Sequence, residues 1–188
     1  MPSDNVLRTI SRNHRGFVYC TAIERGDYSD WKFLWDRFVG GSQDVGYERS
    51  DIVWALTCSR NQRITRTLLK KTLNEKLLRP EDCVKIFDHV SQQGAGARNI
   101  TMDFIRRNWP SMFFMWKDKF LEILIQMSSR ILDEKEFNEM RSLYYNFNDT
   151  MAEVTWAFQQ SSHNIISNSA WMNSQYKDIQ KWLQANIT

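Results

Sequence analysis

A chain of 188 residues with 42% hydrophobic and 25% charged residues suits one sizeable globular domain. It contains only 7 glycines and 3 prolines, which argues against an all-β protein built from many tight turns. The formal charge is only +3, and the one basic run at an end holds Arg8, Arg12 and Arg15. We expect that run to be a solvated terminal segment, because nucleic-acid binding needs a denser basic stripe with exposed aromatics.

The first half of the chain predicts a polar linker followed by four helices. Residues 1–15 have no helical period, so they are assigned to the linker, and residues 16–188 to the domain. The first helix ends at Gly26, and Asp30 is expected to cap the second, which carries Trp31, Leu34, Trp35 and Phe38 as one apolar stripe. The four helices are expected at about residues 16–25, 31–39, 44–59 and 61–73.

The second half predicts further helices and no strand. Pro80 with Glu81 and Asp82 is a strong helix start, and Pro110 is expected to break or restart the next helix. Further helices are expected over residues 119–131, from 133, from about 151 past 165, and a last one around 176–183.

Helices joined by short loops predict an all-α fold of stacked antiparallel pairs. Helices recur every 18 to 20 residues or so, although the repeats are not alike in sequence. This spacing indicates an irregular α-solenoid of the HEAT or armadillo kind.

No catalytic or metal-binding residue is predicted. The histidines His14, His89 and His163 are far apart and lie in no zinc motif. Ser161 and Ser162 precede His163, but neighbours on a helix point in different directions, so they do not form a nucleophile and base pair.

Other reactive or aromatic residues have structural interpretations. Cys83 lies on an apolar helix face and is expected to be a buried, inert thiol. Arg79 with Asp82 could clamp a substrate, but a helix-start pair is the more ordinary interpretation. The tryptophans on helix stripes are expected in the core: Trp31, Trp35, Trp54 and Trp109.

Three Asn-x-Ser/Thr triplets favour a secreted chain. They start at Asn99, Asn148 and Asn186, and the first two are the expected glycosylation sites. The polar N-terminus is not a signal peptide, and the longest apolar run, Met112–Trp116, is far shorter than the roughly 20 residues of a membrane span. We therefore expect a fragment of a longer secreted protein, with no direct membrane insertion.

Cys20 and Cys58 fall in the first and third predicted helices. A disulfide between them would stabilise the fold by roughly 4 kcal/mol in the loop-entropy model. Two free buried thiols fit the spacing equally well, and Cys83 would be left over in either case.

The ordered motifs of the chain resemble the C-terminal domain of the aminopeptidase N family of zinc metallopeptidases, which includes the endoplasmic-reticulum aminopeptidases. The resemblance spans roughly residues 14–184. It is carried by Val18-Tyr19-Cys20-x-Ala22-Ile23 with Gly26, Trp31-x-Phe33-x-Trp35-x-x-Phe38, Ala55-Leu56-x-Cys58-Ser59, Leu78-Arg79-x-x-Asp82, Asp103-Phe104 with Asn108-Trp109, and Trp182-Leu183.

The resemblance implies a helical bowl that covers an upstream catalytic domain and helps to enclose peptide substrates. It implies that zinc and the catalytic motifs lie upstream, that this part holds no cofactor, and that Cys20 and Cys58 form a disulfide. Some members dimerise through this domain, so a homodimer is also expected, in an extracellular or secretory-pathway location. The chain departs from the family at residues 97–101, expected here as a loop that contains the Asn99 triplet, and the start of the family domain is missing.

The leading hypothesis is therefore a non-catalytic C-terminal domain of a zinc aminopeptidase that removes N-terminal residues from peptides. The alternative is a stand-alone α-solenoid that binds peptides or proteins without enzyme activity. A cytosolic helical adaptor with reduced thiols is a third hypothesis.

Overall fold

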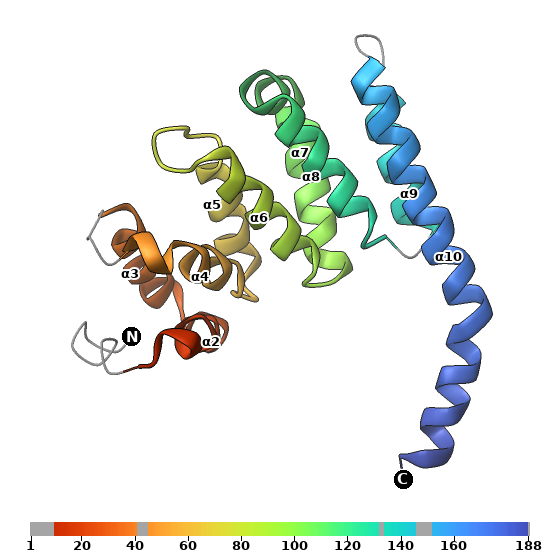
Figure 1. Ribbon diagram of the computed structural model, residues 1–188, viewed down its shortest axis with the longest axis horizontal. Helices are drawn as coiled ribbons and strands as arrows, with labels where there is room; N and C mark the ends of the chain where they lie inside the picture. The colour runs from red at the N-terminus through yellow and green to blue at the C-terminus, as the bar shows by residue number, and fades with distance from the viewer. Residues whose placement is uncertain (1–9, 41–44, 132–133, 146–151, 188) are drawn as a thin grey trace. The chain divides into compact units, whose positions relative to one another are not determined.

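The computed structural model describes residues 10–40, 45–131, 134–145 and 152–187. These residues form helices and no strand, so the prediction of an all-α fold is confirmed (Figure 1). The helices are α2 (Arg12–Arg25), α3 (Tyr28–Val39), α4 (Val45–Thr57), α5 (Gln62–Lys71), α6 (Pro80–Ser91), α7 (Ala95–Trp116), α8 (Asp118–Ser128), α9 (Glu134–Tyr145) and α10 (Ala152–Asn186). The solenoid assignment and the division into linker and domain stay predictions.

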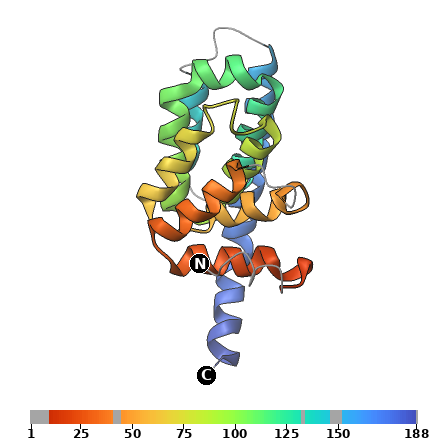
Figure 2. The ribbon, with the colours of Figure 1, turned by 90° about the vertical axis from the view of Figure 1, so that its left-hand side faces the viewer.

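The chain divides into two compact units, Met1–Lys119 and Phe120–Thr188. In the first unit α4 contacts α2, α3 and α6, while α7 contacts α5 and α6 (Figures 1 and 2). Its largest fully buried side chains include Trp31, Tyr19 and Phe87. The predicted stripe of α3 is confirmed, because Trp31, Leu34, Trp35 and Phe38 are all buried.

A capping box at Asp27 starts α3, three residues before the predicted cap at Asp30. The Asp27 carboxylate accepts from the backbone N–H of Ser29 at 2.7 Å, and Asp30 accepts from the N–H of Asp27 at 3.2 Å. The hydrogen bond from the Ser29 side chain, with those from the backbone N–H groups of Ser29 and Asp30, lowers the pKa of Asp27. Gly26 permits this tight turn, since a Cβ there would lie 2.6 Å from the Ala22 carbonyl oxygen.

Helix α2 begins at Arg12, earlier than the predicted start at Gly16. Arg15 is not solvated as expected, because its side chain is only 15% exposed and pairs with the buried Glu48 of α4. Glu48 also accepts from Tyr19 OH at 3.1 Å and lies 3.5 Å from the Arg37 guanidinium of α3. This charge cluster joins three helices, so its arginines are structural. Arg8 lies outside the described residues.

Helix α7 runs through Pro110, so the predicted break there is wrong. Proline removes one backbone donor, but Pro110 is exposed, while Trp109 and Met112 beside it are buried and hold the helix against the core. Residues 97–101, expected as a loop, form part of the first turns of the same helix. Gly94 precedes them with a φ of +104°, a conformation that favours glycine.

The second unit packs α9 against α10. Tyr144 of α9 and Ser161 of α10 share a buried hydrogen bond of 3.1 Å, and burial raises the pKa of Tyr144. Helix α10 is continuous, so the separate last helix predicted around residues 176–183 is wrong. The predicted Asn148 site and the helix starts at Asp133 and Met151 lie outside the described residues. Among the described helices, none is long and apolar enough to cross a membrane.

Candidate functional site

The structure joins Cys20 of α2 and Cys58, the residue after α4, in a disulfide, with their Cα atoms 5.3 Å apart. The pair fixes the end of α4 against α2. Nearby, the Glu24 carboxylate of α2 pairs with the Arg60 guanidinium in the turn before α5. Two links of different chemistry therefore hold the same corner of the first unit.

A pocket of about 640 Å³, lined by both polar and apolar groups, opens beside this disulfide. Its lining comes from α2, the end of α4, the α4–α5 turn, the start of α5, the C-terminal end of α6 and the start of α7. The lining residues are Cys20, Glu24, Trp54, Thr57, Cys58, Ser59, Arg60, Gln62, Thr65, His89, Gln92, Gln93, Gly96, Ala97 and Ile100. Its size is in the range of pockets that hold small ligands or peptide side chains.

Hydrogen bonds at helix ends fix the pocket wall. The Gln93 side-chain amide donates to the Thr57 carbonyl, which joins the end of α6 to the end of α4. The Ser59 hydroxyl accepts from the Asn61 backbone N–H at 3.3 Å. Asn61 in turn caps α5 by accepting from the Arg63 N–H at 2.9 Å. These hydrogen bonds between neighbouring helix ends therefore hold the pocket wall in place.

The pocket carries hydrogen-bonding groups, some of which already have partners within the chain. Its two sulfurs are joined to each other, and the Thr57 hydroxyl donates to the Trp54 carbonyl at 2.6 Å. His89 is half-buried in the pocket wall. The arrangement suits binding of a peptide through side-chain amides, a carboxylate and a guanidinium.

Trp54 was predicted in the core, but it is only half-buried and lines the pocket. The exposed Phe17 ring packs edge-on against it with ring centroids 5.3 Å apart. Trp31, Trp35 and Trp109 are buried, as predicted. The stripe pattern could not reveal this difference, because it gives the face of a helix and not what covers that face.

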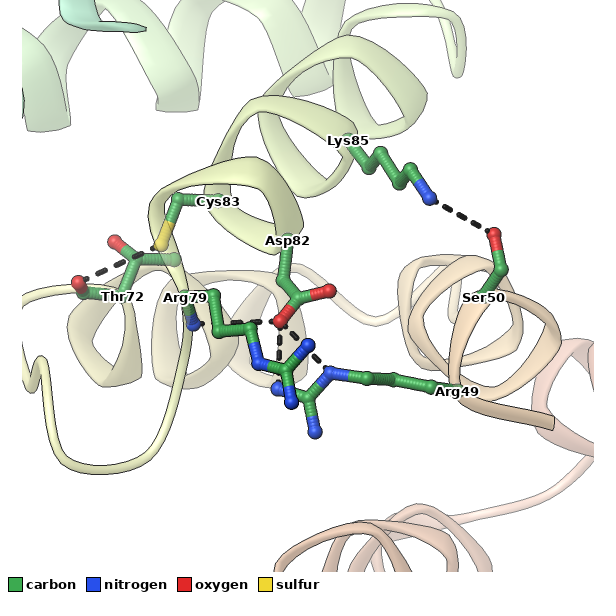
Figure 3. A network of polar contacts seen from close by, with 7 residues as sticks. All are labelled: Arg49, Ser50, Thr72, Arg79, Asp82, Cys83 and Lys85. Carbon is green, nitrogen blue, oxygen red and sulfur yellow. Dashed lines mark hydrogen bonds and ion pairs between the residues drawn. The ribbon is translucent and has the colours of Figure 1, made fainter. Parts of the chain in front are cut away.

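A second polar cluster surrounds Asp82 at the start of α6, where Figure 3 shows side chains from α4 and α6 turned toward one another. One oxygen of Asp82 accepts from Arg49 Nε at 3.0 Å, from Arg49 Nη2 at 2.6 Å and from the Arg79 backbone N–H at 3.3 Å. The Arg49 guanidinium also lies 4.4 Å from the centre of the Phe38 ring. Arg79 with Asp82 is therefore a helix-start pair, as the ordinary interpretation held.

Cys83 is fully buried next to this cluster, and its thiol lies 3.8 Å from the Thr72 carbonyl oxygen (Figure 3). Burial, with smaller contributions from Asp82 and Glu81, raises the pKa of the Cys83 thiol to about 12. A protonated and inaccessible thiol is a poor nucleophile.

The remaining candidate residues lie apart. His163 is exposed, whereas Ser161 is buried against Tyr144, so they do not face one another. Asn99 is exposed on α7, while the Thr101 of its triplet is buried. Asn186 ends α10 and donates to the Trp182 carbonyl at 2.8 Å. Glycosylation at Asn99 and Asn148 stays a prediction.

Sequence comparisons identify one family and several relatives of the chain. The ERAP1-like C-terminal domain family matches residues 1–167. Aminopeptidase N of Canis lupus familiaris is 26% identical over 93% of this chain and 18% of its own length. Aminopeptidase Ey of Gallus gallus is 24% identical over 94% of this chain and 18% of its own length. The thyrotropin-releasing hormone-degrading ectoenzyme of Homo sapiens is 23% identical over 93% of this chain and 16% of its own length.

The chain spans less than a fifth of the length of these relatives. The resemblance seen in the sequence motifs is confirmed, since both the family pattern and the relatives agree with it. The chain belongs to the ERAP1-like C-terminal domain family.

Proposed function

We propose that the chain is the non-catalytic C-terminal domain of a zinc aminopeptidase that removes N-terminal residues from peptides. The observation that carries the proposal is the family match over residues 1–167, together with relatives named aminopeptidases that are about five times longer than this chain. Their remaining length leaves ample room for a catalytic domain upstream.

Zinc belongs to the upstream part in this proposal. Among the described residues, no three or more His, Cys, Asp or Glu side chains are grouped so that they could hold a metal ion. The residues that the structure describes therefore do not fit the metal of the family, and no catalytic step is assigned to them.

The domain would cover the active site and help to enclose the peptide. The pocket beside the Cys20–Cys58 disulfide supports this role, because it presents amide, carboxylate and guanidinium groups beside apolar ones. Its partners would be the upstream catalytic domain, peptide substrates and a second copy of the protein. The disulfide and the ectoenzyme among the relatives favour an extracellular or secretory-pathway location.

The test compares the intact parent enzyme with a form that lacks this domain. We expect the shortened enzyme to keep cleaving a small aminoacyl reporter and to lose its dependence on peptide length, because the enclosing wall is gone. The chain alone should cleave no reporter and bind no stoichiometric zinc. Reporter cleavage with stoichiometric zinc in the isolated chain would overturn the proposal, as would a parent transcript that encodes no upstream peptidase.

A pocket variant sharpens this test. In the intact enzyme, Gln92→Ala should change the KM of long peptides and leave the small reporter unaffected, since Gln92 lines the pocket and is exposed. Lys76→Ala is the matched control, because Lys76 is exposed in the α5–α6 connection and does not line the pocket. Equal effects of the two variants would contradict a peptide-contacting role.

A further inference from the structure

A groove of about 360 Å³ lies between α5 and α7 in the first unit. Leu69 and Ile100 are buried at its base, and Leu73 and Phe104 are half-buried at its edge. Leu73 and Phe104, over the buried Leu69 and Ile100, form an apolar floor that is partly open to water. An apolar side chain of a partner would be stabilised there by removing this surface from water.

Two cations on α5 border the groove without a counter-ion. Arg66 and Lys70 are exposed and lie one turn apart. Neither side chain forms an ion pair or hydrogen bond with any residue that the structure describes. Like charges at this spacing destabilise a helix. Lys70 gains from the negative end of the α5 dipole, but Arg66, a turn earlier, has no such compensation.

The α7 side of the groove adds a cation that is already paired. Arg107 Nη2 lies 3.0 Å from Asp103 Oδ2, and both residues line the groove. Three cationic side chains therefore face one carboxylate, which leaves the rim with two uncompensated positive charges. Two turns beyond Arg107 on α7, Phe114 is 82% exposed.

We propose that this groove binds an extended acidic segment of a partner protein. An apolar side chain of the segment would cover Leu73 and Phe104, and neighbouring carboxylates would pair with Arg66 and Lys70. Charge complementarity selects this partner, because the rim is cationic and the floor is apolar. A nucleic acid or sulfated polysaccharide would leave the floor uncovered and needs a longer cationic track. The proposal does not depend on the enzymatic role of the parent.

The test uses the full 188-residue chain and a fluorescent peptide with both ends blocked, of sequence Gly-Leu-Glu-Glu-Ser-Phe-Gly. Binding is measured by fluorescence anisotropy. We expect saturable binding that weakens as NaCl rises from about 50 to about 300 mM, because salt screens exposed charges. The double variant Arg66→Glu with Lys70→Glu should weaken binding at least about tenfold, since each lost charge pair contributes to the complex.

Matched controls separate the groove from general charge. The double variant Arg25→Glu with Lys76→Glu reverses the same number of exposed charges away from the groove and should bind as the unaltered chain does. A peptide with serine in place of leucine and phenylalanine tests the floor and should bind at least about tenfold more weakly. Circular dichroism checks that every variant is folded, and the neutral pair Arg66→Gln with Lys70→Gln replaces the reversal if it is not.

Three results would overturn the proposal. The first is no saturable binding of the peptide at low salt. The second is an equal loss of binding in the groove and control variants. The third is binding of heparin or single-stranded DNA that depends on Arg66 and Lys70, with no binding of the peptide, since this would make the groove a polyanion site.

Discussion

Replacement of Asp82 by alanine should destabilise the first unit through two losses at once. The Asp82 side chain is only 8% exposed and accepts both Arg49 donors as well as the Arg79 N–H (Figure 3). Loss of the helix-start hydrogen bond costs about 0.5–2 kcal/mol. Loss of a hydrogen bond to a charged partner costs about 1.5–3 kcal/mol.

The two losses add to about 2–5 kcal/mol, and we expect the lower part of this range, about 2–4 kcal/mol. The expected loss stays below the cost of breaking a fully buried pair, because the Arg49 side chain is 23% exposed and can recover some hydration. Arg49 also keeps its position over the Phe38 ring, 4.4 Å from its centre, which limits the rearrangement. Urea unfolding followed by circular dichroism measures the loss.

Two further variants make the measurement decisive. Lys85→Ala is the control, since Lys85 is exposed and makes one hydrogen bond of 3.1 Å to Ser50 in the same helix pair (Figure 3). It should cost under about 1 kcal/mol. A double-mutant cycle of Asp82→Ala with Arg49→Met should give a coupling of about 1–3 kcal/mol. A loss from Asp82→Ala no larger than that of the control, or a coupling near zero, would refute the reasoning.

Other expectations follow from the disulfide, the buried thiol and the last helix. The Cys20–Cys58 disulfide joins residues with a sequence separation of 38. Its reduction should lower the free energy of unfolding by about 4 kcal/mol in the chain-entropy model. Equal urea midpoints for the oxidised and reduced chains would contradict this. The pKa of the Cys83 thiol is raised from 9.0 to about 12. The stabilisation that the protonated thiol provides is therefore complete below pH 9 and should fall as the pH rises toward 12. If a Cys83→Ala variant loses as much stability at alkaline pH as the unaltered chain, the loss has another cause. Removal of residues 171–188 should leave the melting temperature of the second unit unchanged, because six large apolar side chains of that segment are more than 40% exposed: Trp171, Tyr176, Ile179, Trp182, Leu183 and Ile187. A clear fall in the melting temperature would count against this.

Helical periodicity predicted much of the fold because burial on a helix follows its turns. The stripe of α3 illustrates this, since all four of its predicted residues are buried. Helix starts were less accurate. The carboxylates of Asp27 and Asp30 are both suited to capping, and the choice between them depends on the close approach at Gly26.

The continuity of α10 could not be read from the sequence, because its reason is tertiary. The sequence predicted a helix from about residue 151 past 165 and a separate last one around residues 176–183, with polar residues between them. In the structure, Asn168 among them donates to the carbonyls of Ser129 and Ile131 at 2.9 and 3.2 Å. These carbonyls follow the end of α8, so the asparagine satisfies the end of a neighbouring helix. A polar residue at such a contact does not interrupt its own helix.

The pocket was also beyond sequence reasoning, because its wall combines residues from distant segments. Its two cysteines were singled out, but spacing alone left a disulfide and free thiols equally open, and only the family resemblance favoured the bond. Nothing in the sequence pattern indicated that Gln93 takes part in the pocket wall. Its role in the wall depends on a backbone carbonyl, that of Thr57, and backbone partners leave no pattern in a sequence.

The position of the disulfide bears on the pocket more than on the core. Cys58 is only half-buried and lies in the pocket wall, whereas the core of the first unit is formed by side chains such as Trp31, Leu56 and Phe87. Trp31 Nε1 donates to the Leu56 carbonyl at 3.0 Å, so α3 and α4 stay joined without the sulfurs. Reduction should therefore loosen the contact between α2 and the end of α4 that Cys20 and Cys58 hold, and with it the pocket wall. The packing of the core side chains should be affected only later. In the proposed enzyme, the redox state of this bond would act on peptide binding through the shape of the wall.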